Sequence, residues 1–297
     1  MFGWSDVQTR QNTVRLLVIL AVILSILGFI CGMAFAVKSS GFMFVVCLIP
    51  AGILWWRFYV NLKSYKEMYK ELVVKKAAEG MFDNFQYSPK VGFDREEIRE
   101  TGIMNMGNRY NSEDMVDGSY KGVTFRRADM YIAEHHQSGK NSYTIVFLRG
   151  TWLSFTYNKR FLTDVQIMSN DFHHGNKKTS RFFVSEEDRR HKFETEDMTF
   201  NRLFTCTCQN DAEAFYLLTP RVMQMLQLLK SEFGCPYMVG FVNNRLHFAI
   251  NSGKNNMEPP IMEEISYERE VEKTRRELKI IANIIDSLAI DRDIFIQ

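Results

Sequence analysis

Hydrophobic residues fill two long runs near the start of the chain. The first run is VRLLVILAVILSILGFICGMAFAV, residues 14–37, and the second is FMFVVCLIPAGILWWRFYV, residues 42–60. A polar turn, KSSG, separates them. Because about 20 apolar helical residues cross the hydrocarbon core of a bilayer, this pattern predicts a two-helix transmembrane hairpin over residues 1–60.

Aromatic and basic residues at the end of the second run indicate a membrane interface, where amphipathic rings and long basic side chains gather. The predicted interfacial residues are Trp55, Trp56, Arg57, Tyr59, Lys63 and Lys66. Basic residues precede the first run and follow the second, whereas only Lys38 lies between them. The positive-inside rule therefore predicts a multi-pass protein of a bacterial inner membrane with both termini in the cytoplasm.

A second interpretation treats the first run as a signal peptide, because AFA at residues 34–36 has the small residues of a cleavage site. The run is longer than the apolar core of a usual signal peptide, and another apolar run follows at once. We therefore favour the hairpin.

After residue 60 the pattern becomes that of a water-soluble domain. Residues 61–84 are interpreted as a juxtamembrane helical stalk and linker, and residues 85–260 as a cytoplasmic α+β domain. Alternating runs rich in β-branched and aromatic residues predict strands, at residues 122–135, 142–157, 164–170, 198–209 and 237–251. No strand–helix–strand rhythm is present, so the sheet is expected to be antiparallel. Asn243-Asn244 predicts the turn of the last hairpin.

Three segments carry helix start signals. Residues 95–101 form a short polar helix ahead of Gly102. Asn210 is an N-cap with Glu213 three residues later, and Thr219-Pro220 places an N-cap directly before a proline at the first helical position.

The last segment, residues 261–297, is expected to form an amphipathic helix over residues 261–290 and a tail. Its apolar stripe recurs every seven residues, which fits either a short coiled coil or packing against the chain's own sheet. With the aromatic strand at residue 152, this stripe is the candidate interaction surface: Trp152, Val271, Leu278, Ile281, Ile285 and Leu288.

Charge and cysteine content narrow the chemistry. Lys and Arg total 37 against 35 Asp and Glu, a net charge of +2, which does not indicate a nucleic-acid partner. Cys206 and Cys208 are expected on one face of a strand, where buried core cysteines are the simpler interpretation. The alternative is a metal site formed by Cys206, Cys208 and His191, although zinc usually prefers a Cys-x-x-Cys knuckle. The pairs His135-His136 and His173-His174 have poor chelating geometry on an extended chain.

Several stretches in order resemble a family of uncharacterised bacterial membrane proteins known only as a domain of unknown function. They are YSPKVGFDREEIRETGIM, NRYNSEDMVDGSYKGVTF, VFLRGTWLSF, FNRLFTCTCQNDAEAFYLLTP and IIANIIDSLAID. The F-x-G-x-aromatic strand and the block that runs from phenylalanine through D-x-E-A to L-T-P carry the resemblance, which covers roughly residues 65–291. It implies membrane anchoring and no known activity. Cys206 and Cys208 stand where that family has valine-like and tyrosine-like residues.

These observations predict an integral membrane protein whose cytoplasmic domain is a binding or assembly module, with no cofactor and no nucleic-acid partner. The expected partners are the lipid bilayer and a protein, or a second copy, bound through the C-terminal helix or the hairpin. Two alternatives stay open. One is a membrane-bound metal-dependent enzyme that uses Cys206, Cys208 and a histidine, and the other is a subunit of a transport or envelope-maintenance complex.

Overall fold

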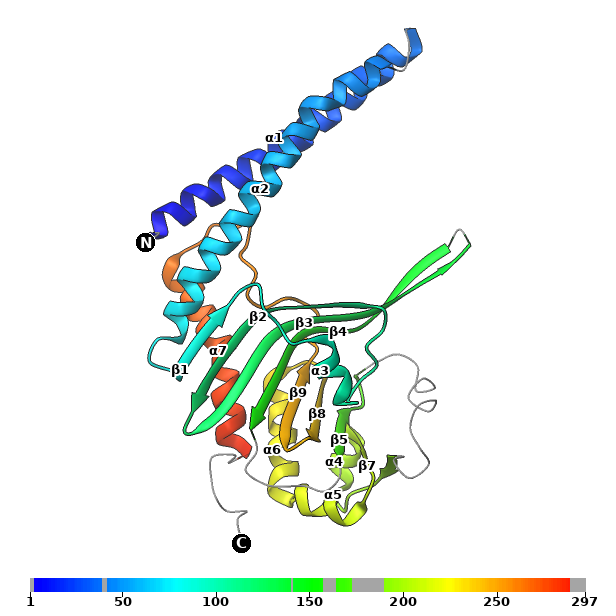
Figure 1. Cartoon of the computed structure of the whole chain (residues 1–297), viewed down its shortest axis with the longest axis vertical. Helices are drawn as coiled ribbons and strands as arrows, with labels where there is room; N and C mark the ends of the chain where they lie inside the picture. The colour runs from blue at the N-terminus through cyan, green and yellow to red at the C-terminus, as the bar shows by residue number, and fades with distance from the viewer. Residues whose placement is uncertain (1–2, 39–41, 140, 157–163, 173–189, 289–297) are drawn as a thin grey trace. The chain divides into compact units, whose positions relative to one another are not determined.

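The computed structural model describes residues 3–38, 42–139, 141–156, 164–172 and 190–288 (Figure 1). The chain divides into two compact units. Unit 1 comprises residues 1–77 and 258–275, and unit 2 comprises residues 78–257 and 276–297. The predicted stalk and the start of the C-terminal segment thus share a unit with the N-terminal helices.

Unit 1 is built on two long helices, α1 (Trp4–Lys38) and α2 (Phe42–Ala78). Small residues allow close approach between such helices, and Ala21 and Ala51 are both buried. The Trp55 indole donates to Ser25 Oγ at 3.1 Å, which joins the two helices through their apolar parts. Nearer the N-terminus, a cluster of buried side chains unites both helices with the returning segment: Val7, Val14, Tyr65, Met68, Tyr69, Val73 and Ile265.

A candidate membrane span, Trp4–Met33, lies within α1. Its most apolar 18-residue window has a mean hydropathy of 2.9, and only 17% of that window is buried. This helix is long and apolar enough to cross a bilayer and is not covered as a core helix would be.

The structure differs from the two-helix prediction, because Trp4–Met33 is the only candidate span among the residues described. Residues 42–60 are helical, as predicted, but they form the first half of a helix that continues to Ala78 with many charged residues. Part of the predicted second run, including the side chains of residues 42–44 and 47, lies outside what the structure describes. The described residues therefore support one N-terminal apolar helix.

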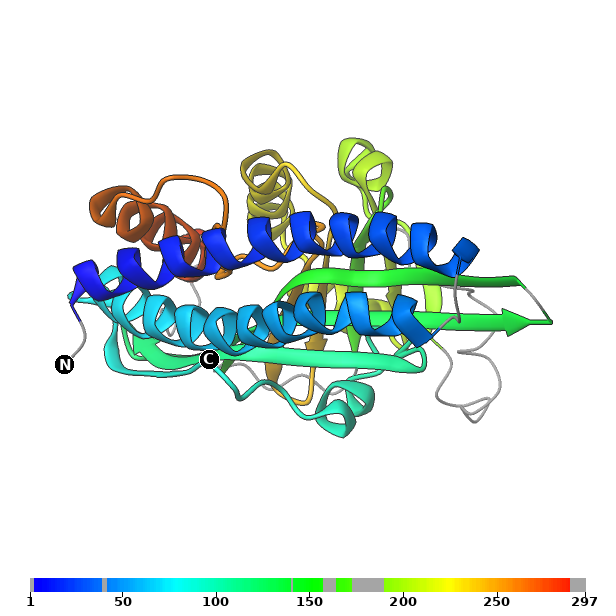
Figure 2. The same cartoon turned by 90° about the horizontal axis from the view of Figure 1, so that it is seen from above.

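Unit 2 contains a nine-stranded sheet in the order β1-β2-β3-β4-β9-β8-β5-β7-β6. Every neighbouring pair is antiparallel, as the sequence predicted. The strands are β1 (Asp83–Ser88), β2 (Arg109–Tyr120), β3 (Val123–Ser138), β4 (Asn141–Thr156), β5 (Val165–Ser169), β6 (His191–Phe193), β7 (Phe204–Cys208), β8 (Tyr237–Val242) and β9 (Arg245–Ile250). The β3–β4 hairpin extends past the other strands as a two-stranded arm (Figure 2).

Three helices of unit 2 begin where the sequence signals predicted: α3 (Arg95–Glu100), α5 (Asp211–Leu217) and α6 (Pro220–Phe233). Helix α4 (Met198–Leu203) was not predicted, and α7 (Tyr267–Leu288), whose later part belongs to unit 2, begins six residues after the predicted start at residue 261. The Asn210 side chain accepts from the backbone N–H groups of Ala212 and Glu213, and Thr219 Oγ1 accepts from Val222. Asn243 and Asn244 adopt φ values of 53° and 55° in the β8–β9 turn, which is the geometry of a type I′ turn.

One predicted strand is wrong in its first half. Residues 198–203 form α4, because the Asp197 side chain caps the N–H groups of Thr199 and Phe200 and starts a helix before the strand. Three strands were missed as well, at residues 83–88, 109–120 and 191–193. Residues 83–88 and 109–120 are rich in Asn, Asp, Ser and Gly, and those residues favour turns over strands when no neighbouring strand is known.

The main core of unit 2 lies around β3, β4, β8 and β9, and Trp152 is at its centre with no exposed surface. The Trp152 indole donates to Nδ1 of His247 at 3.3 Å, so its polar N–H is satisfied inside the core.

The apolar stripe of α7 is also buried within the chain. Leu278, Ile281 and Ile285 are at most 1% exposed, and Leu288 is 7% exposed. Val271 packs, partly buried, against the cluster of unit 1. Because Trp152 and these helix residues are covered by their own chain, they do not form an exposed surface.

Candidate metal centre

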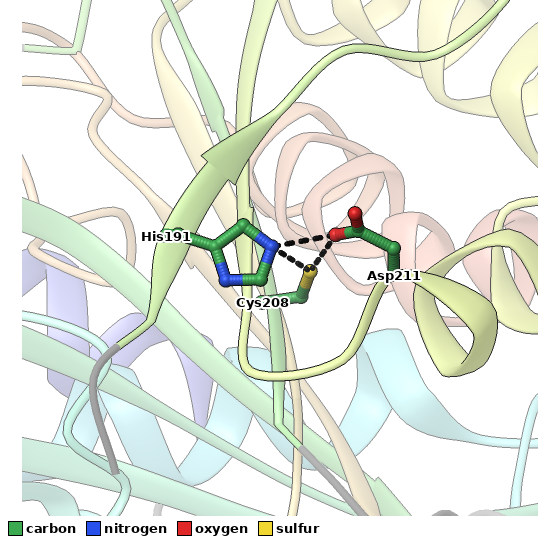
Figure 3. A group of neighbouring side chains, drawn as sticks. All are labelled: His191, Cys208 and Asp211. Atoms are coloured by element: carbon green, nitrogen blue, oxygen red, sulfur yellow. Dashed lines mark hydrogen bonds and ion pairs between the residues drawn. The ribbon is translucent and has the colours of Figure 1, made fainter. Parts of the chain in front are cut away.

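His191 and Cys208 meet at one edge of the sheet. Strand β6 is the edge strand and pairs with β7, and His191 lies directly opposite Cys208 in that register. Directly opposed residues of an antiparallel pair project on the same face. The two side chains therefore point to a common position although 17 residues separate them in the sequence (Figure 3).

Asp211 completes the group from the first position of α5. Asn210 caps this helix, so the chain turns sharply after β7 and brings the Asp211 carboxylate back beside Cys208. Figure 3 shows the three side chains converging from a strand edge, a strand end and a helix start. The spacing Cys208-x-x-Asp211 is that of a zinc knuckle in which a carboxylate replaces the second thiolate.

The three potential ligand atoms lie within 4.8 Å of one another. Asp211 Oδ1 is 2.6 Å from His191 Nε2 and 3.3 Å from Cys208 Sγ, and the sulfur is 4.0 Å from the same nitrogen. Around a tetrahedral zinc ion such atoms stand roughly 3.4 to 3.6 Å apart. Shifts of less than about 1 Å would therefore convert this arrangement into three corners of a zinc tetrahedron.

The protonation of the group depends on Cys208. Burial, together with the hydrogen bond to Asp211 and the negative charge of that carboxylate, raises the pKa of its thiol to about 12. Hydrogen bonds from His191 and Cys208 lower the pKa of the Asp211 carboxyl. The metal-free group thus consists of a thiol that donates to a carboxylate, and a bound cation would have to displace the thiol proton.

The arrangement does not fit a nucleophilic cysteine triad. Such a triad needs the carboxylate on the ring nitrogen opposite the one that faces the nucleophile, but Asp211 and Cys208 both face Nε2 of His191. A raised thiol pKa also disfavours the thiolate that attacks substrates. The convergence of the three side chains on one point is an arrangement that could hold a cation.

Cys206 does not join this group, in contrast to the sequence-based site of two cysteines and a histidine. It lies on the same face of β7 as Cys208 but opposite Phe193, and it is 2% exposed. Burial raises its thiol pKa to about 12. Cys206 is therefore a core cysteine, as the simpler interpretation held.

The two histidine pairs, His135-His136 and His173-His174, do not join the candidate metal centre among the residues described. His135 contacts Thr144, and His136 stacks on Tyr143 at a centroid distance of 4.9 Å, both on the β3–β4 arm. His173 and His174 lie outside the described residues.

The predicted interfacial residues are mostly exposed on α2, including Trp56 at 68% and Tyr59 at 67%. Trp55, Arg57 and Lys63 are exposed as well. Lys66 differs, because its ammonium forms an ion pair with Glu258 at 2.5 Å within unit 1.

Comparisons with known proteins match part of the chain to a family model. Residues 146–290 match the model of a family described as "Protein of unknown function (DUF3137)", which agrees with the resemblance to an uncharacterised family. No curated protein matches the chain.

Among solved structures, the chain is similar to the crystal structure of the mycobacterial trehalose monomycolate transport factor A, TtfA. The similarity has 11% sequence identity and a TM-score of 0.39, and it covers 75% of this chain and 95% of that one. A likeness of this degree carries no argument about function. The chain thus contains a domain of unknown function behind an apolar N-terminal helix.

Proposed function

We propose that the chain is a membrane-anchored metal-binding protein. In this proposal the N-terminal helices hold it in a bilayer, and His191, Cys208 and Asp211 bind one zinc-class ion on unit 2. The convergence of three ligand atoms from separate elements carries the metal-binding part. The domain then acts as a binding module, the role that the sequence predicted.

The ligand set favours zinc among common metal ions. One thiolate, one imidazole and one carboxylate are the donor types of zinc sites, whereas calcium and magnesium prefer oxygen alone. Three protein ligands leave one coordination position for water or an external ligand. His191 and Asp211 have side chains that are about half exposed, at 50% and 56%, so a small ligand can approach this position.

A metal-dependent enzyme is the second candidate, favoured by the same open position. Water bound to zinc with three protein ligands loses a proton near neutral pH and becomes a nucleophile. Zinc-dependent turnover that Cys208→Ser abolishes and Cys206→Ser preserves would support this reading, and turnover in Cys208→Ser would exclude it.

Membrane anchoring through both helices is supported by exposed apolar side chains on each. Those on α1 include Leu16, Ile19, Ile23, Ile26, Phe29 and Ile30, and those on α2 include Val45, Ile49, Ile53 and Val60. Water-soluble proteins rarely expose so continuous an apolar surface. The charge asymmetry of the sequence favours cytoplasmic termini. A reporter enzyme fused after residue 297 should be active only if it works in the cytoplasm, and activity of a periplasmic reporter there would overturn the orientation.

Zinc analysis of the purified full-length protein tests the metal-binding proposal. After equilibration with buffered zinc and removal of the free ion, we expect one zinc per chain. His191→Ala and Asp211→Asn should lose most of it, whereas His135→Ala on the β3–β4 arm should keep it. Zinc retained equally by all four proteins, or by none, would contradict the proposal.

A further inference from the structure

Residues 258–266 belong to unit 1 and pack against α1 near Gln11 and against α2 near Tyr65. Lys66 and Lys70 of α2 hold Glu258 at 2.5 and 2.9 Å, and the Tyr65 hydroxyl donates to the carbonyl of Pro260 at 2.8 Å. The side chain of Ile265 is buried in the cluster shared with α1 and α2. The segment is thus fixed within unit 1 at several points.

Two polar side chains of α1 hold the backbone of this segment. Gln11 donates to the carbonyls of Pro260 and Glu263 at 3.0 and 2.8 Å, and Arg15 donates to the Glu263 carbonyl at 2.8 Å. Gln11 is only 3% exposed, so this is a built contact and not a loose surface loop. Met262 lies between the held carbonyls, and its side chain is 61% exposed.

The position of this contact along α1 coincides with the start of the apolar surface. Leu16 directly follows Arg15 and is the first large apolar side chain exposed on that helix, at 57%. On α2, the exposed Tyr59 and Trp56 mark the equivalent boundary, and Asn61 accepts from Arg10 at 2.8 Å just beyond it. Aromatic belts of this kind stand at the headgroup level of a bilayer.

We propose that residues 260–264 form a membrane-surface contact in which Met262 inserts among the phospholipid headgroups. The proposal rests on the membrane anchoring proposed above and adds a third contact to the two helices. The hydrogen bonds from Gln11 and Arg15 fix the position of the loop along α1, and the carbonyls of Ile261 and Glu263 accept hydrogen bonds from the Arg15 guanidinium beside the apolar surface. The flexible, exposed thioether of Met262 continues the apolar surface that begins at Leu16.

Photo-crosslinking to lipid tests this contact in the full-length protein reconstituted into phosphatidylcholine vesicles. A benzophenone amino acid replaces Met262, and two matched variants carry it at Ile26 and Lys75. Ile26 is exposed in the candidate span and reports anchoring itself. Lys75 is exposed on α2 about 21 Å beyond Asn61 along the helix axis.

The expected result is lipid adducts at positions 26 and 262 and only background at position 75. Adducts at 26 without adducts at 262 would overturn the surface contact while leaving the anchor intact. Absence of adducts at 26 would overturn the anchor, and the contact with it. Equal adducts at 262 and 75 would show that the label does not report a specific contact, and would also overturn the proposal.

Discussion

Cys206 and Cys208 have different chemistry although they share one face of one strand. Cys206 faces Phe193 inside the core, whereas Cys208 lies at the strand end beside an imidazole and a carboxylate. The strand pattern predicts that both cysteines share a face, but it does not predict which residues lie beside each of them. The residues beside Cys208 come from the edge strand β6 and from the start of helix α5. The Cys208-x-x-Asp211 spacing was the one signal in the sequence that could have identified Asp211.

The thiol of Cys208 makes zinc binding depend on pH. Because the pKa of this thiol is raised to about 12, the ion must displace its proton at neutral pH. We expect the apparent zinc affinity to rise about tenfold per pH unit between about pH 7 and 8. Competition with a zinc-binding dye at several pH values measures this slope. An affinity that does not change with pH would exclude a thiolate ligand.

His247 is expected to link stability to acidity. Burial lowers its pKa from 6.5 to about 3, and the positive charge of Arg245 acts in the same direction. Between these two values the unfolded chain binds a proton that the folded chain does not, so stability falls as the pH falls. The slope is about 1.4 kcal/mol per pH unit.

Urea unfolding of the full-length protein at a series of pH values from neutral to acid measures this dependence. His247→Gln should be less stable at neutral pH, because the Trp152 indole loses the His247 Nδ1 atom to which it donates. The stability of this variant should, however, depend less on pH. A variant with the same pH dependence as the original would exclude His247 as the linked group.

At the scale of single elements, local signals predicted helix starts and tight turns well. Asn210, Thr219-Pro220 and Asn243-Asn244 each work through their own side chain or backbone, so no tertiary information is needed. Strand β1 depends on a partner instead, because it exists through its pairing with β2. Helix α4 has a local signal of its own, the N-cap Asp197, which the sequence analysis missed because a run rich in β-branched and aromatic residues follows it. Edge strand β6, only three residues long, has too short a pattern to predict at all.

The β8–β9 turn gives a test at this scale. Asn244 has a φ of 55°, a conformation that costs side chains other than Gly, Asn and Asp about 1–2 kcal/mol. Asn244→Val should therefore lower the free energy of unfolding by about that amount, and Asn244→Gly should be close to neutral. Equal stability of both variants in urea unfolding would show that the positive φ of residue 244 does not determine the stability of this turn.

At the scale of the whole molecule, the units are discontinuous in sequence. Unit 1 combines residues 1–77 with residues 258–275, and its buried cluster contains Val7 and Val14 of α1 beside Tyr65 and Ile265. The sequence predicted a membrane part followed by a separate domain, because hydrophobic patterns show which segments are apolar but not which distant segments share a core.

Removal of the N-terminal helices should therefore disrupt the folding of unit 1 as well as its membrane anchoring. A truncated chain that begins at residue 61 would expose the remaining cluster residues of α2, and we expect it to bind a hydrophobic dye and to aggregate. Size-exclusion chromatography checks this, with Ile26→Ala in the full-length chain as a control that should remain monodisperse in detergent. A soluble, monodisperse truncated chain would contradict the shared cluster.

Cobalt binding tests the central claim, the metal centre, most directly. Cobalt replaces zinc in tetrahedral sites, and a thiolate ligand adds a charge-transfer absorption that other ligands do not give. We predict this absorption with one cobalt per full-length chain, its loss in Cys208→Ser, and its retention in Cys206→Ser two residues away on the same face. Absorption that persists in Cys208→Ser, or that the original protein never shows, would contradict it.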